Sequence, residues 1–273
     1  MRSVLSLSLL LMLSLGGYAA AQSPYHAASV APFVPSKAAV VDQMLDLGKV
    51  GPGDYHIDLG SGNGRLVIAA AQRGALAHGV EINGPLVEQS RAAAREAGVA
   101  DQTVFLHQDI FETDFSQATV VTIYLMPEGN ARLRPLLLER LRPGSRVVSN
   151  TFGMREWEPD EHITGQAGSG LFLWVIPAQV AGRWEFEVDE RSWELQLRQH
   201  FQQLTPALQR DGKTLRADRT LLRGRNLQLI TTVDGVRHAF HGEAQGDQIE
   251  GFVQISSEGE ERVERWRAHR VAR

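Results

Sequence analysis

The chain contains no cysteine among its 273 residues. This absence excludes disulfide bonds, thiolate-ligated metal sites and cysteine nucleophiles together. An excess of positive charge is also missing, because the formal net charge is -4. A dedicated nucleic-acid-binding protein would carry clustered cations for phosphate contacts, so no nucleic-acid partner is expected. Hydrophobic and charged residues make up 43% and 22% of the chain, as in ordinary globular proteins, which excludes a disordered chain and a coiled coil.

Several catalytic motifs are missing as well. The nine histidines form no His-Glu-x-x-His motif and no other paired-ligand spacing, so no metal site is expected. His238 and His241 fall in one expected strand and, at this odd spacing, should point to opposite faces. Neither Ser61 nor Ser169 lies in a Gly-x-Ser-x-Gly motif, which leaves the nucleophile elbow of an α/β-hydrolase unsupported.

The apolar run at residues 4–15 is too short to cross a bilayer comfortably, which takes roughly 20 residues. Arg2 precedes this run, and the small residues Ala19-Ala20-Ala21 follow it. This order is typical of a secretory signal peptide that is cleaved before Gln22. The alternative is an uncleaved membrane anchor. We therefore expect residues 1–21 to be a signal peptide and the remaining chain to be exported, either periplasmic or secreted.

Residues 22–178 are expected to form an α/β domain. Short apolar runs alternate there with helical stretches, which is typical of a parallel sheet with crossover helices. Strands are expected at residues 56–59, 77–80, 104–107, 120–124, 146–151 and 171–176. Helices are expected at residues 36–47, with Ser36 as the N-cap, and at residues 65–73, 85–97 and 128–141.

Residues 179–273 have a different period. The apolar residues Trp193, Leu195, Leu197 and Phe201 alternate with polar ones, which is the spacing of a strand with one solvated face. Asp234-Gly235 is a strong signal for a two-residue hairpin turn. Asp211-Gly212 and Gly246-Asp247 are further turn signals. The sequence thus predicts an antiparallel β domain of six to eight strands, either a barrel or a sandwich.

The most informative segment lies between an expected strand and an expected helix. It reads Asp58-Leu59-Gly60-Ser61-Gly62-Asn63-Gly64-Arg65. Glycines at alternate positions allow the backbone to turn sharply and to approach a ligand closely, and the helix N-terminus offers N–H donors. A dinucleotide site would favour Gly-x-Gly-x-x-Gly, whereas here an acid precedes an alternating glycine loop. Asp58 therefore indicates a ligand that bears an amine rather than a pyrophosphate.

Two further acids follow the next two expected strands. Glu81 ends the segment Gly79-Val80-Glu81, where a carboxylate can accept hydrogen bonds from both hydroxyls of a ribose. Asp109 lies in Gln108-Asp109-Ile110, where an adenine amino group would find an acceptor. The carboxyl ends of parallel strands form one rim of a sheet, and ligands of open α/β sheets bind on that rim. Three acids on one rim are much harder to explain structurally than any one of them alone.

These segments resemble the seven-strand class I S-adenosylmethionine-dependent methyltransferases. Within that class they resemble the protein lysine methyltransferases that act on the mitochondrial ATP synthase c-subunit and on the adenine nucleotide translocase. Further matching segments are Pro32-Phe33-Val34-Pro35-Ser36, Tyr124-Leu125-Met126-Pro127 and Pro143-Gly144-Ser145-Arg146-Val147-Val148-Ser149. The resemblance covers roughly residues 31–177. Asn63, where an acid is common in the family, and the secretory leader in place of mitochondrial targeting are departures from its pattern.

The resemblance implies a Rossmann-like sheet and S-adenosyl-L-methionine as the cofactor. Asp58 and the glycine loop would hold the methionine part, Glu81 the ribose, and Asp109 with Ile110 the adenine. The loop residues concerned are Gly60, Ser61, Gly62 and Gly64. The implied substrate is a protein lysine, and the resemblance suggests a lysine in a membrane protein.

Methyl transfer is an in-line displacement at a sulfonium, so the protein mostly positions the reactants and excludes water. Tyr124, at the end of the fourth expected strand, is the candidate for orienting the incoming amine. A tyrosine packed at the end of the sheet is the alternative. Phe33 and Pro35 are candidates for a lid over the substrate, or for a hydrophobic staple of the first helix. Asn150 and Trp157 are either pocket walls or structural residues.

Two functions are consistent with the sequence. The first is an active methyltransferase, acting on a protein lysine. The second is an exported, non-catalytic binding protein that retains the fold and uses the β domain as its interaction module. The leader favours the second, because a charged sulfonium made in the cytoplasm does not cross a bilayer unaided. The three acids favour the first.

Overall fold

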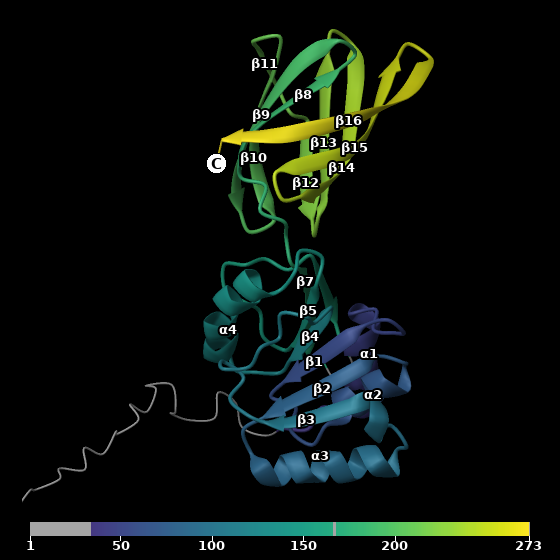
Figure 1. The fold of residues 1–273 in the computed structure, drawn as a ribbon, viewed down its shortest axis with the longest axis vertical. Helices are drawn as coiled ribbons and strands as arrows, with labels where there is room; N and C mark the ends of the chain where they lie inside the picture. The colour runs from purple at the N-terminus through teal and green to yellow at the C-terminus, as the bar shows by residue number, and fades with distance from the viewer. Residues whose placement is uncertain (1–33, 166–167, 273) are drawn as a thin grey trace, which may run out of the picture.

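The structure is a computed structural model that describes residues 34–165 and 168–272. The molecule consists of two stacked bodies. A seven-stranded sheet flanked by helices forms the lower body in Figure 1, and a nine-stranded sheet forms the upper body. Within the described residues, no helix combines the length and the apolar character needed to cross a membrane. The expected signal peptide, residues 1–21, lies outside the described residues.

The lower sheet has the strand order β3-β2-β1-β4-β5-β7-β6. Its strands are β1 (Tyr55–Leu59), β2 (Leu76–Glu81), β3 (Thr103–His107), β4 (Val120–Ile123), β5 (Arg146–Asn150), β6 (Glu161–Thr164) and β7 (Gly170–Val175). Strands β1 to β5 are parallel, and β7 runs antiparallel to β5. The topology confirms the expected methyltransferase-like α/β fold. Its register pairs Asp58 with Gly79 of β2 and with Thr122 of β4.

Helices cover both faces of this sheet. They are α1 (Ala38–Leu47), α2 (Arg65–Gln72), α3 (Gly84–Glu96) and α4 (Pro127–Arg140). The first three share a buried core with one face of the sheet, to which they contribute Val41, Val67 and Val87. Helix α4 packs Leu133 and Leu137 into the core on the other face, and Figure 1 shows it on the opposite side of the sheet from α1 and α2. The two cores pack against both faces of the sheet and so hold in place the rim at which the carboxyl ends of β1 to β5 lie.

Three details of the lower body differ from the sequence-based expectations. Ser36 does not cap α1, because the N-cap is Lys37, whose side chain makes no capping hydrogen bond. Tyr124 follows β4 rather than ending it, since the strand stops at Ile123. No expected strand covers β6, whose four side chains are largely exposed and show no alternating apolar pattern.

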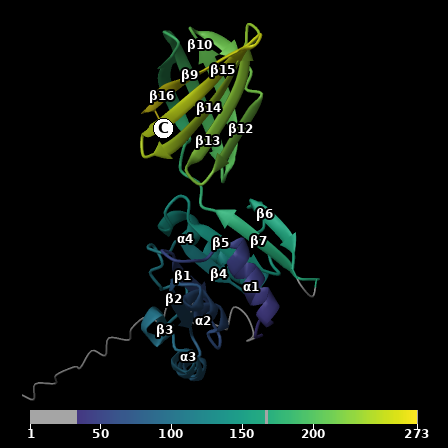
Figure 2. The ribbon, with the colours of Figure 1, turned by 90° about the vertical axis from the view of Figure 1, so that its right-hand side faces the viewer.

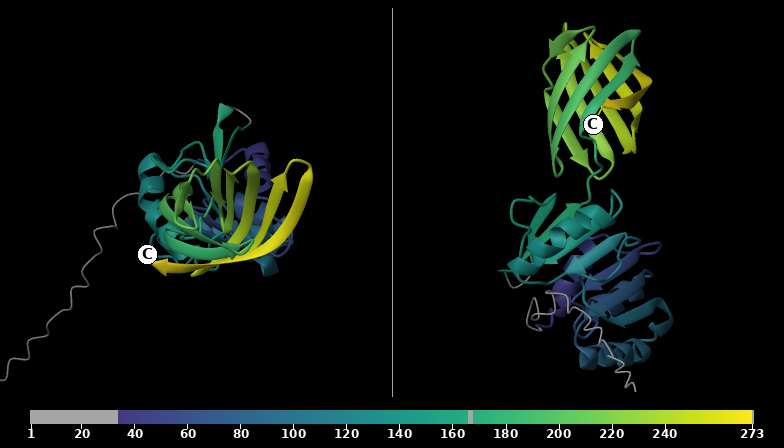
Figure 3. Two further views of the ribbon diagram at one scale, coloured as in Figure 1. Left: turned by 90° about the horizontal axis from the view of Figure 1, so that it is seen from above. Right: turned by 60° about the vertical axis from the view of Figure 1, so that its left-hand side comes forward.

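The upper sheet is antiparallel throughout and has the order β11-β10-β9-β8-β16-β15-β14-β13-β12. Its strands are β8 (Gly182–Val188), β9 (Arg191–His200), β10 (Gln203–Arg210), β11 (Lys213–Leu215), β12 (Arg219–Arg223), β13 (Asn226–Val233), β14 (Val236–Gln245), β15 (Gln248–Ser257) and β16 (Glu260–Ala272). The sheet curls into a half-barrel, as Figure 3 shows, and β10 also approaches β12. The barrel alternative is thus correct. The expected six to eight strands were too few, because β11 and β12 are short and mostly exposed.

An aromatic core fills the inside of the half-barrel. Trp184, Trp193 and Phe240 are buried there, with Leu195 and Leu197 alongside them. Phe201 does not belong to this core, although the alternating pattern placed it on the same face. Phe201 lies beyond the end of β9 and packs against the core of the lower body instead.

The three turn signals of the β domain are confirmed as hairpin turns. Asp234 and Gly235 both have positive φ, 52° and 80°, between the paired residues Val233 and Val236. Asp211-Gly212 joins β10 to β11, and Gly246-Asp247 joins β14 to β15. Figure 2 shows the resulting series of hairpins side by side.

The two histidines of β14 occupy opposite faces, as their spacing predicts. His238 is buried and packs against Trp193, with 5.2 Å between ring centroids and an angle of 57° between the ring planes. His241 instead stacks on the half-exposed ring of Phe252, at 5.1 Å.

Candidate active site

The loop between β1 and α2 can be built only with glycine at three positions. Gly60, Gly62 and Gly64 have φ values of 87°, 54° and 78°, a region that residues with side chains rarely adopt. A Cβ on Gly64 would lie 2.8 Å from a ring carbon of Phe105 and 2.9 Å from the side chain of Ser90. The loop is therefore pressed against α3 and β3.

Glu81 lies directly against this loop. Its Oε2 accepts a hydrogen bond of 2.9 Å from the backbone N–H of Gly62, and its Oε1 accepts one of 2.9 Å from that of Asn83. These bonds fix the half-buried carboxylate at the carboxyl end of β2. Each oxygen retains lone pairs for further donors, such as the two hydroxyls of a ribose.

Asp58 is almost completely buried, with 4% of its surface exposed. Its Oδ1 accepts a hydrogen bond of 2.7 Å from the hydroxyl of Thr122. Burial raises the pKa of the Asp58 carboxyl to about 7; the Thr122 hydrogen bond lowers it, and the nearby Glu81 carboxylate raises it. A cationic amine placed beside Asp58 would recover the lost solvation of its carboxylate.

His56 extends this buried network, although no motif in the sequence pointed to it. Its Nε2 lies 2.9 Å from Oγ1 of Thr122, so the Thr122 hydroxyl bridges His56 and Asp58. Burial lowers the pKa of His56 to about 3, which keeps its ring neutral. The only available signal was the period of two in β1, which places His56 and Asp58 on one face of the strand.

The third acid, Asp109, follows β3 at the same rim. Its Oδ1 accepts a hydrogen bond of 2.9 Å from the backbone N–H of Phe111, and its backbone carbonyl accepts one of 2.8 Å from Thr113. Ile110 is 6% exposed and packs into the core on the α4 face. Asp109 is thus held in a turn, while Ile110 contributes mainly to the core.

The residues expected on the substrate side differ in their burial and position. Tyr124 is half-buried immediately after β4, at the rim where β1 ends with Leu59. Pro35 is exposed and precedes α1. Phe33, its expected partner in a lid, lies outside the described residues. Asn150 and Trp157 are both buried, at 4% and 1% exposure, which makes Trp157 a structural residue of the core.

The rim fits an S-adenosyl ligand in three respects. The loop has no side chain at Gly60, Gly62 or Gly64, so a ligand can lie against its backbone there. The hydroxyl of Ser61 in the same loop is buried and has no hydrogen-bond partner among the described residues. Asp58 offers a carboxylate for an amine, and Glu81 offers one for ribose hydroxyls. Because β1, β2 and β3 are parallel, Asp58, Glu81 and Asp109 lie at the same rim, at the carboxyl ends of the three strands.

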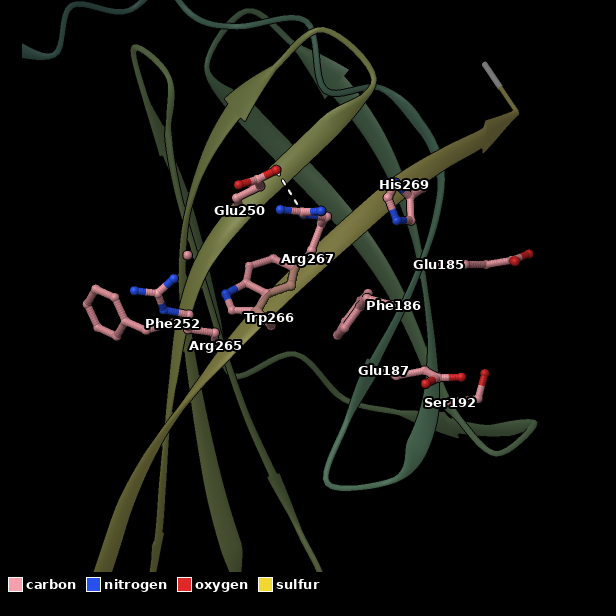
Figure 4. Close-up of a pocket in the computed structure, with 11 residues that line it drawn as sticks. Glu185, Phe186, Glu187, Ser192, Glu250, Phe252, Arg265, Trp266, Arg267 and His269 are labelled. Atoms are coloured by element: carbon pink, nitrogen blue, oxygen red, sulfur yellow. Dashed lines mark ion pairs between the residues drawn. The ribbon is translucent and has the colours of Figure 1, made fainter.

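A separate groove lies on the β domain, over β8, β15 and β16 (Figure 4). Both signs of charge line it, with Glu185 and Glu187 on one side and Arg265 on the other. Arg267 of β16 forms an ion pair of 2.9 Å with its neighbour Glu250 of β15. Mixed charge of this kind favours no single class of ligand. Across the described ranges 34–165 and 168–272, no group of three or more side chains is arranged to hold a metal ion.

Comparisons with known proteins agree with this geometry. Residues 58–161 match the model of the ANTKMT methyltransferase domain. A protein-lysine N-methyltransferase of Saccharolobus islandicus is 39% identical over 150 residues, which are 53% of this chain and 93% of that enzyme. The chain therefore belongs to the same methyltransferase family as this enzyme.

Other relatives cover the same part of the chain. The lysine N-methyltransferase of the ATP synthase c-subunit from Mus musculus is 35% identical over 54% of this chain and 59% of its own length. The crystal structure of an RNA methyltransferase from Salinibacter ruber, in complex with S-adenosyl-L-homocysteine, is 47% identical, with a TM-score of 0.52 over 54% of this chain and 96% of that one. S-adenosyl-L-methionine is the cofactor of this chain.

Proposed function

We propose that the chain transfers a methyl group from S-adenosyl-L-methionine to a lysine of a protein. The proposal is carried by the rim on which Asp58, Glu81 and Asp109 follow three adjacent parallel strands beside the glycine loop. The named activities of the archaeal and mouse relatives support a lysine as the acceptor.

The roles of the rim residues follow from their positions. S-adenosyl-L-methionine supplies an electrophilic methyl group when it is bound. Asp58 would hold its amine, Glu81 the ribose hydroxyls, and Asp109 the adenine amino group. Tyr124 would orient the acceptor amine, which must lose a proton before it attacks. The protein needs no nucleophile of its own, because the acceptor amine is the nucleophile.

We also propose that the chain is exported, on the basis of the apolar run at residues 4–15 and the alanines before Gln22. Export favours the second function, an exported binding protein that retains the fold without catalysis. The cofactor must then reach the protein outside the cytoplasm, which its charge opposes.

The experiment uses the chain from Gln22 onward and methyl-tritiated S-adenosyl-L-methionine, with membrane and soluble extracts of the source cells as acceptors. Glu81→Ala is the control variant. Tritium recovered as methyllysine after acid hydrolysis, with little in the control, supports the proposal. Label that ribonuclease removes would instead assign an RNA acceptor, as the name of the Salinibacter ruber protein suggests. A protein that binds no cofactor in calorimetry would favour the non-catalytic function.

A further inference from the structure

The segment at residues 151–158 follows β5 and begins at the rim of the sheet. Because β4 and β5 are parallel neighbours, this segment starts beside the end of β4, where Tyr124 lies. Two of its residues hold left-handed backbone conformations, Thr151 with φ 70° and Arg155 with φ 57°. Such conformations are unfavourable for residues with side chains and persist only where surrounding contacts impose them.

Helix α4 supplies part of those contacts. The side-chain amide of Asn130 donates hydrogen bonds of 2.9 Å and 3.2 Å to the carbonyls of Phe152 and Gly153. Arg134 donates one of 3.0 Å to the carbonyl of Met154 and pairs with Glu156 at 2.7 Å. Both side chains belong to the methyltransferase domain itself.

Strands β5 and β7 add further hydrogen bonds, from Ser149 Oγ to the carbonyl of Phe152 and from Trp174 Nε1 to the carbonyl of Trp157. The β domain also contacts the segment, through the turn between β9 and β10, residues 201–202. Trp157, which is 1% exposed, lies between the rings of Trp174 and Phe201, with centroid distances of 5.8 Å and 5.6 Å. Gln202 accepts a hydrogen bond of 2.8 Å from Trp157 Nε1 and donates one of 2.7 Å to the carbonyl of Glu158. The guanidinium of Arg134 lies 5.6 Å from the centroid of the Phe201 ring.

This turn is itself held firmly. Phe201 has a φ of 54°, and its carbonyl accepts a hydrogen bond of 2.7 Å from Gln199 Nε2. The same side chain donates to the carbonyl of Ala178 and accepts from the N–H of Val180, so it ties the turn to the connection between the two bodies. A second turn of the β domain docks nearby, where Gly224 accepts a hydrogen bond of 2.8 Å from Ala178.

We infer that Phe201 and Gln202 are positioning residues for the methyl acceptor, acting through residues 151–158. The β9–β10 turn and α4 both contact this segment, so the β domain contributes to the conformation of the acceptor side of the site. The inference rests on the proposed function. Small displacements of groups that orient a reactant cause large losses of rate, which gives such a support its value.

The cofactor side has different supports. The glycine loop is held by Glu81, Ser90 and Phe105, all within the methyltransferase domain. Loss of the turn contacts should therefore affect the acceptor and leave cofactor binding unchanged. A residue that merely stabilised the whole fold would weaken both.

The test compares Gln202→Ala with Gln203→Ala, a matched control at an adjacent, exposed residue of β10. Phe201→Ala is compared with Glu190→Ala, because Glu190 has a similar φ of 56° in the turn at the other end of β9. Three quantities are measured: hydrogen exchange of residues 151–158, the Kd for S-adenosyl-L-methionine, and kcat/KM for the acceptor found by the methyllysine assay.

For Gln202→Ala we expect exchange in residues 151–158 to rise and kcat/KM for the acceptor to fall, each by about tenfold, since two hydrogen bonds are lost. The Kd for the cofactor should stay within about twofold, and both controls should match the wild type. Unchanged kcat/KM in Gln202→Ala and Phe201→Ala, or an equal loss of cofactor affinity, would overturn the inference alone. A wild-type protein that methylates no protein lysine would instead overturn the proposed function, and the inference with it.

Discussion

If Asp58 holds the amine of the cofactor as proposed, its buried carboxyl should make cofactor affinity depend on pH. With the pKa of this carboxyl at about 7, a protein at pH 6 holds it mostly protonated, and it must lose the proton to bind a cationic amine. Affinity for S-adenosyl-L-methionine should therefore rise roughly eightfold between pH 6 and pH 7.5. In the free protein the sign is opposite: from the ordinary pKa of 3.8 up to about 7 the folded state binds the extra proton, so stability falls as pH rises.

Thr122→Val tests this assignment, because it removes the 2.7 Å hydrogen bond that favours the charged carboxyl. A hydrogen bond to a charged group is worth roughly 1.5–3 kcal/mol, so the pKa of Asp58 should rise by about one to two pH units. At pH 7.5 the variant should then bind the cofactor roughly 3- to 25-fold more weakly than the wild type. Thr122→Ser retains the hydroxyl and should behave as the wild type.

The assay is titration calorimetry from pH 6 to pH 7.5, where the amine of the ligand stays largely protonated. The second ligand is 5′-methylthioadenosine, which lacks the amino acid part and should bind independently of pH and of Thr122. Valine also leaves the His56 ring without its Thr122 partner, so the melting temperature of each variant is recorded. A wild-type affinity that is flat over this range, or an equal loss for both ligands in Thr122→Val, would refute the reasoning.

Three further predictions concern other parts of the chain. Glu81→Ala should weaken cofactor binding by about 1–3 kcal/mol in calorimetry, because Gly62 N–H and the ribose hydroxyls lose their acceptor, and unchanged affinity in a folded variant would remove Glu81 from the site. Gly64→Ala should lower the free energy of unfolding by about 2 kcal/mol or more in urea titrations, since its φ is 78° and its new Cβ would overlap Phe105; an unaffected midpoint would contradict this. Mass spectrometry of the exported protein should find an N-terminus at or near Gln22, and a cytosolic product that retains Met1 would contradict export.

The sequence was most informative where a local pattern determines the structure. The alternating glycines and the strand-end acids depend on backbone conformation and strand direction, so Asp58, Glu81 and Asp109 could be placed on one rim. The hairpin at Asp234 could be predicted for the same reason.

Contacts between distant segments could not be predicted in this way. Thr122 reaches Asp58 and His56 only through the pairing of β1 with β4. Phe201 fits the period of β9 but turns away at its end, because Trp157 of the other body offers it a partner. Short strands with exposed side chains, such as β11, leave no periodic signal at all.

The position of β16 has a consequence for biosynthesis. This strand follows the others in sequence yet lies in the middle of the curled sheet, between β8 and β15. During translation the two halves of that sheet emerge first and expose two unpaired edges, of the kind that promote aggregation. The two halves can join only after residues 260–272 leave the ribosome. A frameshift or proteolytic cut before β16 would therefore be expected to remove the whole half-barrel rather than one strand of it.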